Sequence, residues 1–247
     1  MNPRLGIIGS GQLALYLCQA ARKLGVHTCV LSEEADVPAA VAADQLLVGE
    51  LDAPELLDIF IDGCDVVTFD KEDIPVASLE RLSAAEREGQ LQVHPSADIL
   101  ALIKDKGLQK SWLEEHGFPT LPFRLLDGKV ADLDALRDEF GLPLVQKART
   151  GGYDGRGVQI LKTEEQLEQL WDTPSLVEPF LADSREIAVL LVRDGDGNCE
   201  VYPVFGMDFD PRLNALDCVY TPAEISADLA AAAQDLGRRV IDALDGV

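Results

Sequence analysis

A glycine-rich segment that carries cations is the part of this sequence best suited to bind a phosphorylated ligand. It reads KARTGGYDGRG and runs from Lys147 to Gly157. The glycines let backbone amides approach an anion without a Cβ in the way, while Lys147 and Arg156 supply positive charge. Glycines alone would equally suit an ordinary β-turn. The two cations, with Tyr153 and Asp154 inside the same turn, favour a loop that covers a triphosphate.

The residues on both sides of this segment are typical of β-strands. An apolar, extended pattern precedes it at residues 144–146 and resumes at residues 158–161. A Walker loop runs from a strand into a helix and ends in Gly-Lys-Ser/Thr, whereas this loop has Arg-Gly and returns into a strand. The sequence therefore predicts a β-hairpin with a phosphate-binding turn, and not a P-loop.

A second glycine motif lies near the N-terminus, where Gly9, Gly11 and Gln12 connect an apolar run at 5–8 to a helical pattern at 12–24. The first amides of a helix have no partner inside the helix, and the helix dipole favours negative charge at that end. These residues therefore predict a second phosphate site.

The same motif is also compatible with a dinucleotide fingerprint. Glu33 and Glu34 lie at about the expected distance downstream, at the end of the next strand. Ala14 stands in the place of the third glycine, which weakens this alternative. The downstream hairpin, which an oxidoreductase would not need, weakens it further.

Strand and helix patterns alternate along the first part of the chain, which predicts a parallel sheet with helices on its faces. We expect strands at 5–8, 27–31, 45–48, 65–69 and 92–94, with helices at 12–24, 54–61, 97–103 and from residue 76. We place the first domain boundary near residue 98, so that a Rossmann-like domain covers residues 1–98.

The rest of the chain predicts an α+β module in two parts, residues 99–178 and 179–247. The first part contains the glycine-rich hairpin, and the second begins after a strand that carries Glu178. Expected elements are helices at 106–116, 163–171 and 227–244, a strand at 175–181, and a hairpin of strands 186–192 and 200–204. The fold class is therefore α/β, with a parallel-sheet domain followed by an α+β module.

The composition argues against some classes of binding partner. The formal net charge is −23, from 44 acidic and 21 basic residues, which argues against nucleic-acid or anionic-membrane binding through a basic surface. The acidic residues are spread along the chain, as in a salt-rich cytoplasm or in a merely acidic protein. The five cysteines have no CxxC or Cys/His spacing, and the N-terminus has no signal segment. We expect a cytoplasmic protein with reduced, largely buried thiols.

The order of the motifs GSGQL, KDKGLQK, KARTGGYDGRG, SLVEPFL, SREIAV and YPV resembles that of the ATP-grasp ligases. The resemblance covers essentially all 247 residues and is closest to the 5-(carboxyamino)imidazole ribonucleotide synthases, the phosphoribosylaminoimidazole carboxylase ATPase subunits. It implies that bicarbonate attacks the γ-phosphate of ATP to give carboxyphosphate, whose carboxyl passes to the amine of 5-aminoimidazole ribonucleotide in purine (IMP) biosynthesis. Such chemistry depends on positioning and charge stabilisation.

The resemblance also implies roles for particular residues. Tyr153 and Arg156 match catalytic positions that contact the imidazole ribonucleotide. Glu178 through Leu181 match the hinge that binds adenine mainly through backbone groups, and Glu186 matches the position that contacts the ribose hydroxyls. The ATP-binding positions are Lys106, Lys147, Gly152, Tyr153, Asp154, Gly155, Arg156, Gly157, Val158, Glu178, Pro179, Phe180, Leu181 and Glu186. The substrate-binding positions are Gly9, Gly11, Gln12, Glu72, Tyr153 and Arg156.

The chain departs from the family pattern at several positions. Ala14 and Leu15 replace a Gly-Arg pair, which removes a cation near the expected substrate phosphate. The usual Tyr/Phe-Glu-x-Glu becomes FDKE at residues 69–72, and Gly206 stands where a polar or acidic residue is common.

The chain also ends at Val247, before the strands expected to carry the Mg²⁺ ligands. No metal ligand is assigned, and we expect this chain alone to be a catalytically incomplete fragment. A homodimer is the default assembly. Two alternatives stay open: another carboxylate-amine or biotin-carboxylase-like ATP-grasp ligase, and a nucleotide-binding module without turnover.

Overall fold

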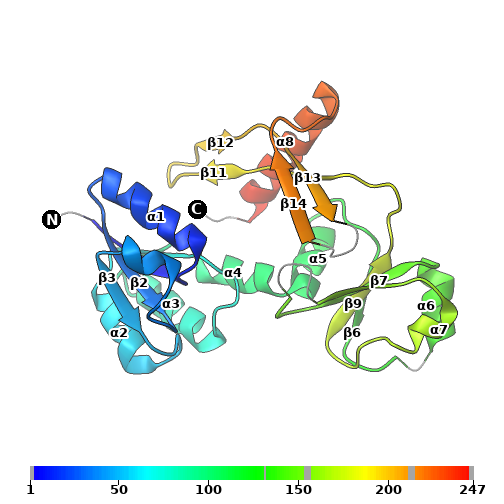
Figure 1. The fold of residues 1–247 in the computed structure, drawn as a ribbon, viewed down its shortest axis with the longest axis horizontal. Helices are drawn as coiled ribbons and strands as arrows, with labels where there is room; N and C mark the ends of the chain where they lie inside the picture. The colour runs from blue at the N-terminus through cyan, green and yellow to red at the C-terminus, as the bar shows by residue number, and fades with distance from the viewer. Residues whose placement is uncertain (1–2, 131, 153–156, 211–214, 245–247) are drawn as a thin grey trace. The chain divides into compact units, whose positions relative to one another are not determined.

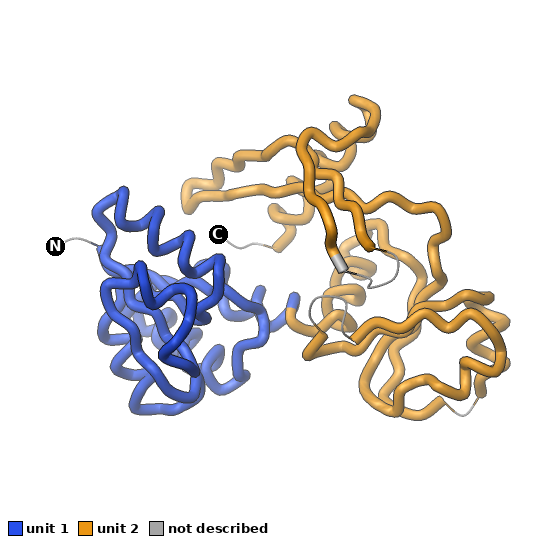
Figure 2. Tube along the Cα trace, viewed as in Figure 1, with its two compact units in different colours: residues 1–103 blue, residues 104–247 orange. Residues whose placement is uncertain are grey.

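The computed structural model describes residues 3–130, 132–152, 157–210 and 215–244. These residues fall into two compact units, residues 1–103 and residues 104–247 (Figure 2). The boundary lies at the end of helix α4 (Ala97–Lys104). The further division of the second unit near residue 178 stays a prediction.

The described residues of the first unit form a parallel five-stranded sheet, which confirms the predicted fold class (Figure 1). Its strands, in spatial order, are β3 (Gln45–Val48), β2 (His27–Ser32), β1 (Arg4–Ile8), β4 (Val66–Phe69) and β5 (Gln92–Val93). The connecting helices are α1 (Gln12–Lys23), the 3₁₀ helix η1 (Pro38–Val41), α2 (Pro54–Asp62) and α3 (Val76–Arg87). Strand β5 stops before Pro95, which has no N–H to continue the ladder.

Each face of this sheet has its own apolar core, because successive strand residues point to opposite faces. Ile7 packs with Ala14 and Cys18 of α1, while Ile8 packs with Phe60 of α2 on the other side. Gly6 allows close packing at the second face. A Cβ at Gly6 would lie 2.6 Å from the Phe60 ring. The two cores therefore fix the position of β1, and with it the turn that follows β1 at the carboxyl end of the sheet.

The second unit begins with helix α5 (Lys106–Glu115) and contains a four-stranded antiparallel sheet. The strand order is β6 (Arg124–Leu126), β9 (Ser175–Pro179), β7 (Leu144–Ala148) and β8 (Val158–Leu161). Helices α6 (Leu133–Phe140) and α7 (Glu164–Leu167) pack on it around a core that includes Leu136, Leu144 and Val177. Strands β7 and β8 pair from Leu144↔Leu161 to Lys147↔Val158, so the predicted hairpin is confirmed.

Several expected elements differ in extent from the structure; strand 200–204 is Cys199–Val201 and strand 175–181 ends at Pro179, and two others differ more. Helix α7 ends at Leu167, short of the predicted residue 171, because the amides of Gln169 and Leu170 form three-residue turns and that of Trp171 donates to the Gln146 side chain at 2.9 Å. The predicted strand 186–192 is two short strands with different partners. They are β10 (Glu186–Ala188), which pairs with β13 (Phe205–Asp210), and β11 (Leu191–Arg193), which pairs with β12 (Cys199–Val201).

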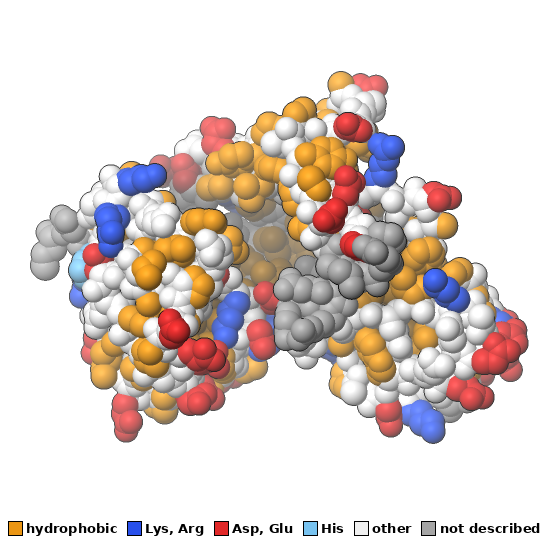
Figure 3. Space-filling model, in the orientation of Figure 1, with side chains coloured by type: hydrophobic (Ala, Val, Ile, Leu, Met, Phe, Trp, Pro, Cys, Tyr) orange, Lys and Arg blue, Asp and Glu red, His pale blue; other side chains and the backbone are white. Residues whose placement is uncertain are grey.

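The remaining described elements are strand β14 (Ala215–Tyr220), which pairs with β13, and helix α8 (Ala227–Ala243). Ser226 caps α8 by accepting a hydrogen bond from the Leu229 amide at 3.2 Å. Acidic side chains are scattered over the visible face, as the spread of Asp and Glu along the sequence predicts (Figure 3). Three cysteines are buried, but Cys199 is half-buried and Cys218 is exposed, so the expectation of largely buried thiols is only partly met.

Candidate functional site

The cation of the glycine-rich hairpin is held by a buried carboxylate. Lys147 lies on β7, and its Nζ is 2.5 Å from Oε1 of Glu178 on the neighbouring strand β9. The Glu178 side chain is 5% exposed, whereas that of Lys147 is 34% exposed. The ammonium of Lys147 is therefore fixed on its strand and still accessible to a ligand.

Glu178 has a second lysine partner that the sequence pattern did not reveal. Its other carboxylate oxygen, Oε2, accepts from Lys110 Nζ. Lys110 also donates to the Leu121 carbonyl at 3.3 Å and lies over the Phe123 ring, 5.3 Å from its centre. The only sequence signal was that Lys110 follows Lys106 by four residues, one turn along the helix in KDKGLQK.

The two ammonium groups explain the ionisation of Glu178. Burial by itself raises the pKa of this carboxyl, but hydrogen bonds and charge from Lys110 and Lys147 outweigh it and hold the pKa below its ordinary value. Both carboxylate oxygens are occupied. The side chain of Glu178 is therefore a support for Lys147 and not a free ligand-binding group.

The residues after Glu178 are more exposed. Phe180 is 38% and Leu181 is 52% exposed. The Phe180 amide is already used, because it donates to the Pro143 carbonyl at 3.1 Å, and the Leu181 carbonyl accepts from the Ser184 hydroxyl at 3.2 Å. Within the described ranges, the Leu181 amide and the Phe180 carbonyl have no such partner, so these are backbone groups that a ligand could use.

A second ion pair joins helix α5 to the base of the hairpin. Asp105 caps α5 by accepting from the amides of Gly107 and Leu108, and it also binds Arg149, with Oδ2 2.6 Å from Nη2 and Oδ1 2.9 Å from Nε. The Lys106 amide donates to the Arg149 carbonyl at 2.9 Å. This clamp places Lys106, the first residue of α5, beside the hairpin.

Charge and hydrogen bonding stabilise the clamp. Burial alone would raise the pKa of Asp105, but Arg149 and the two helix amides lower it below its ordinary value. The hydrogen bonds that Arg149 donates to Asp105 in turn raise the pKa of Arg149. A Cβ on Gly107 would lie 2.8 Å from Arg149 Nε, so a glycine is needed where the guanidinium crosses the helix. The sequence pattern assigned Arg149 no role.

Part of the expected lid lies outside the described residues, namely Tyr153, Asp154, Gly155 and Arg156. The base of the loop is described. The Ala148 amide donates to the Gly157 carbonyl at 2.8 Å. Gly157 has a φ of +79°, and its Cβ position would be 3.0 Å from Gly152 Cα. Both features require glycine at this closure of the hairpin, next to Val158.

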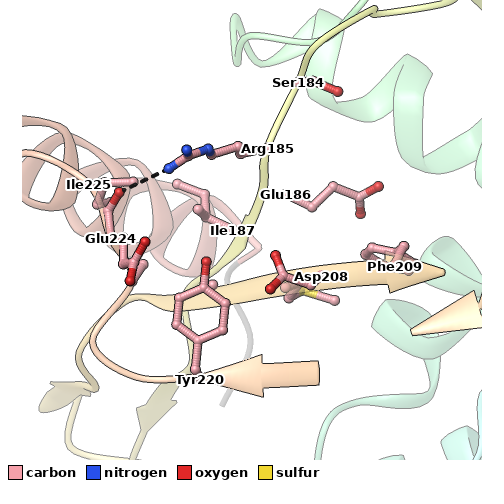
Figure 4. A pocket seen from close by; sticks show the side chains of 12 residues that line it. Ser184, Arg185, Glu186, Ile187, Asp208, Phe209, Tyr220, Glu224 and Ile225 are labelled. Carbon is pink, nitrogen blue, oxygen red and sulfur yellow. Dashed lines mark hydrogen bonds between the residues drawn. The ribbon is translucent and has the colours of Figure 1, made fainter. Parts of the chain in front are cut away.

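A cavity of about 390 Å³ lies beside the β10–β13–β14 sheet, and Glu186 is one of the residues that line it (Figure 4). The other residues lining it are Ser184, Arg185, Ile187, Gly206, Met207, Asp208, Phe209, Tyr220, Ala223, Glu224 and Ile225. Arg185 points to the loop after β14 and donates to the Glu224 carbonyl at 3.4 Å. Three carboxylates and one guanidinium therefore line this cavity, which leaves it with a net negative charge.

The first unit has a cavity of about 310 Å³ at the turn after β1. It is lined by Gly9, Ser10, Gly11, Ser32, Glu33, Leu51, Asp70 and Lys71. The predicted residues Gly9 and Gly11 lie here, whereas Gln12 begins α1 and Glu72 is exposed, and neither lines the cavity.

The amide at the start of α1 already has an anionic partner. Gly11 N–H donates to Asp70 Oδ2 at 2.5 Å, so a carboxylate of the chain occupies the expected anion position. Lys71 Nζ is 2.7 Å from Glu33 Oε2. In the sequence, Asp70 and Lys71 stood out only as departures from a pattern, because their approach to the glycine turn depends on the pairing of β1 with β4.

No group of three or more His, Cys, Asp or Glu side chains within the described ranges is placed to hold a metal ion. The described residues therefore give no ligand set for Mg²⁺, and none is assigned. Among the same residues, no helix has the length and apolar character needed to cross a membrane.

Two family matches agree with this architecture. Residues 2–104 match the family described as a ribonucleotide synthetase preATP-grasp domain, and residues 111–247 match the ATP-grasp domain. The parallel N-terminal sheet followed by antiparallel sheets around a glycine-rich hairpin defines an ATP-grasp protein.

Individual relatives show which family of ATP-grasp proteins the chain resembles. The N5-carboxyaminoimidazole ribonucleotide synthase of Synechocystis sp. is 35% identical, and the match covers 98% of this chain and 60% of that protein. The synthase of Brucella melitensis is 31% identical, and the match covers 98% of this chain and 67% of that protein. The crystal structure of the Thermotoga maritima synthetase matches with a TM-score of 0.83 at 33% identity, covering 99% of this chain and 62% of that one. The chain belongs to the N5-carboxyaminoimidazole ribonucleotide synthase family, and it spans about 60% of the length of the Synechocystis relative.

Proposed function

We propose that the protein takes part in the ATP-dependent carboxylation of 5-aminoimidazole ribonucleotide by bicarbonate, a step of purine (IMP) biosynthesis. The observation that carries the proposal is the Glu178-supported Lys147 at the base of a glycine-rich hairpin, in a chain that matches this family over both units. A crystal structure of the Aspergillus clavatus synthase contains ADP and 5-aminoimidazole ribonucleotide, at 27% identity and a TM-score of 0.85.

We propose the following roles in binding ATP. Lys147 and Lys106 neutralise phosphate oxygens, and the loop from Gly152 to Val158 covers the phosphates with its amides. Backbone groups of residues 179–181 bind the adenine, and Glu186 accepts from sugar hydroxyls. The side chain of Glu178 has a supporting role in addition, because both of its carboxylate oxygens hold lysines.

The ribonucleotide substrate is proposed to bind at the first unit's cavity, with its phosphate near Gly9 and Gly11. Lys71 is the cation in the lining of this cavity. Because Asp70 already accepts from the Gly11 amide, a phosphate would have to use other amides of the turn or displace that carboxylate. Tyr153 and Arg156 are proposed to contact the imidazole ribonucleotide from the lid.

The chemistry consists of two displacements. A bicarbonate oxygen attacks the γ-phosphorus and ADP leaves, which gives carboxyphosphate. The substrate amine nitrogen then attacks the carboxyl carbon, phosphate leaves and the amine loses a proton. The protein contributes positioning and fixed positive charge at the phosphate oxygens, with no covalent intermediate. Magnesium would offset phosphate charge when bound.

Three further properties are proposed from family membership and composition. We propose the cytoplasm as the location, a homodimer as the assembly, and Mg²⁺ as the metal that accompanies ATP. Symmetric dimers are the commonest assemblies of soluble proteins, and the net charge of −23 argues against a nucleic-acid partner on electrostatic grounds.

The test is phosphate release from ATP with bicarbonate and 5-aminoimidazole ribonucleotide. It is run on the 247-residue chain and on a version extended by the segment that follows in the Synechocystis relative. We expect turnover in the extended protein, and a loss on the order of 10²-fold in kcat/KM for Lys147→Met. Lys162→Met, which changes an exposed lysine beyond β8, is the matched control.

Two results would contradict the proposal. Turnover with a different amine but none with aminoimidazole ribonucleotide would assign another ATP-grasp ligase activity. Nucleotide binding without turnover in either protein would identify a binding module.

A further inference from the structure

A tyrosine on β14 fills the space that a glycine leaves on β13. Gly206 and Tyr220 are directly paired across the two strands. A Cβ built on Gly206 would lie 2.4 Å from Tyr220 Cζ and 2.7 Å from its hydroxyl oxygen. Because real Cβ atoms do not approach other atoms so closely, the phenol ring occupies the place of a side chain at residue 206.

The ring lies at the cavity that contains Glu186. Gly206 is also paired with Ile187 on β10, and Asp208 lies two residues along β13, so all three share the sheet face of Tyr220. In Figure 4 the phenol projects into the cavity, with its hydroxyl between the carboxylates of Asp208 and Glu224 in that view. Tyr220 is half-buried, and within the described ranges its hydroxyl has no hydrogen-bond partner.

The charge of the cavity indicates which part of a nucleotide it can take. Glu186, Asp208 and Glu224 line it together with one cation, Arg185, which donates to the Glu224 carbonyl. The cations Lys106 and Lys147 lie at the hairpin. Carboxylates repel phosphates and accept hydrogen bonds from hydroxyl groups. A tyrosine hydroxyl can both donate to and accept from a sugar hydroxyl. The cavity is therefore suited to the sugar of a nucleotide, and the hairpin to its phosphates.

We propose that Tyr220, whose ring fills the space left by Gly206, is a ligand-contacting specificity residue and that its hydroxyl binds a ribose hydroxyl of the adenine nucleotide. This inference rests on the proposed function, because it takes ATP as the ligand of the second unit. A side chain at residue 206 would otherwise supply this polar contact. Here the contact comes from a residue of the neighbouring strand.

The experiment is a ligand-observed NMR titration of the 247-residue chain with ADP, 2′-deoxy-ADP and 3′-deoxy-ADP. Tyr220→Phe keeps the ring on Gly206 and removes only the hydroxyl. We expect it to weaken ADP binding about 2- to 10-fold, the value of one neutral hydrogen bond. The loss should disappear for the deoxy nucleotide that lacks the contacted hydroxyl. Tyr202→Phe, outside the cavity, should bind all three nucleotides as the wild type does.

The outcomes separate this inference from the proposed function. Equal ADP affinities of the wild type and Tyr220→Phe would overturn the role of Tyr220 and leave the proposed function intact. An equal loss for all three nucleotides would also overturn it, because the hydroxyl would then not contact the sugar. If the wild-type chain binds none of the nucleotides, the proposed nucleotide site fails and this inference fails with it. Unchanged melting temperatures of both variants would show that a change in affinity is not caused by a loss of folding.

Discussion

Glu178 Oε1 lies 2.5 Å from Lys147 Nζ, and the carboxylate is almost fully buried while the ammonium remains accessible. Lys110 binds the other oxygen of the same carboxylate. One buried anion thus fixes two cations on adjacent elements, and only one of these, Lys147, has a third of its side chain open to solvent. This arrangement makes the position of Lys147 depend on residues that need not touch a ligand.

Replacing Glu178 by Gln should destabilise the protein, because two lysines lose their counter-charge. We expect a loss of about 2–4 kcal/mol in the free energy of unfolding, near the lower part of the range for broken buried pairs since Lys147 is partly exposed. Urea denaturation measures it. Glu139→Gln, at an exposed pair with Arg124, is the control and should change stability little. Equal effects of the two substitutions would contradict the structural role given to Glu178.

The contribution of Glu178 should depend on pH in a defined direction. Its folded-state pKa is lowered from 4.5, so the unfolded chain binds more protons than the folded protein as the pH falls below that value. The stabilisation should therefore be complete above pH 4.5 and decline as the pH falls through the folded pKa. Unfolding of the wild type and Glu178→Gln between pH 7 and pH 3 checks this. A stability difference that grows on acidification would show that the sign is wrong.

Arg149→Lys should loosen the clamp between α5 and the hairpin. Arg149 contacts both carboxylate oxygens of Asp105, and a lysine cannot reproduce this two-point contact. We expect a loss of about 1–2 kcal/mol in unfolding free energy. Arg87→Lys, at the exposed last residue of α3, is the matched control and should have little effect. An unchanged free energy of unfolding for Arg149→Lys would mean that a single contact with Asp105 is enough to hold the clamp.

Gly206→Ala should displace Tyr220, because the new methyl group would overlap the phenol ring. Overpacking of this kind costs about 1–3 kcal/mol. The cost should shrink when Tyr220→Ala is combined with it, which a double-mutant cycle measures as a coupling free energy. Strictly additive effects would show that the ring does not lie on Gly206 in solution.

Local patterns of residue type determine much of this fold. The alternation of apolar strands and amphipathic helices predicts the parallel sheet, because hydrophobic periodicity is a property of neighbouring residues. The glycine-rich segment between two strand patterns predicts the β7–β8 hairpin for the same reason. Element ends are less predictable. Helix α7 stops early because the Trp171 amide donates to Gln146, 25 residues away in the chain.

The working arrangement of the candidate site depends on contacts between distant residues. Lys110 and Glu178 are 68 positions apart, and Asp105 and Arg149 are 44 apart, so no local pattern brings them together. The packing of α5 against the sheet does so, and the pairing of β9 with β7 adds Lys147 beside Glu178. The sequence by itself determined that a glycine-rich hairpin with a cation is present. Only the tertiary structure decided that Glu178 supports this cation, because strand pairing and burial select the partners of a charge.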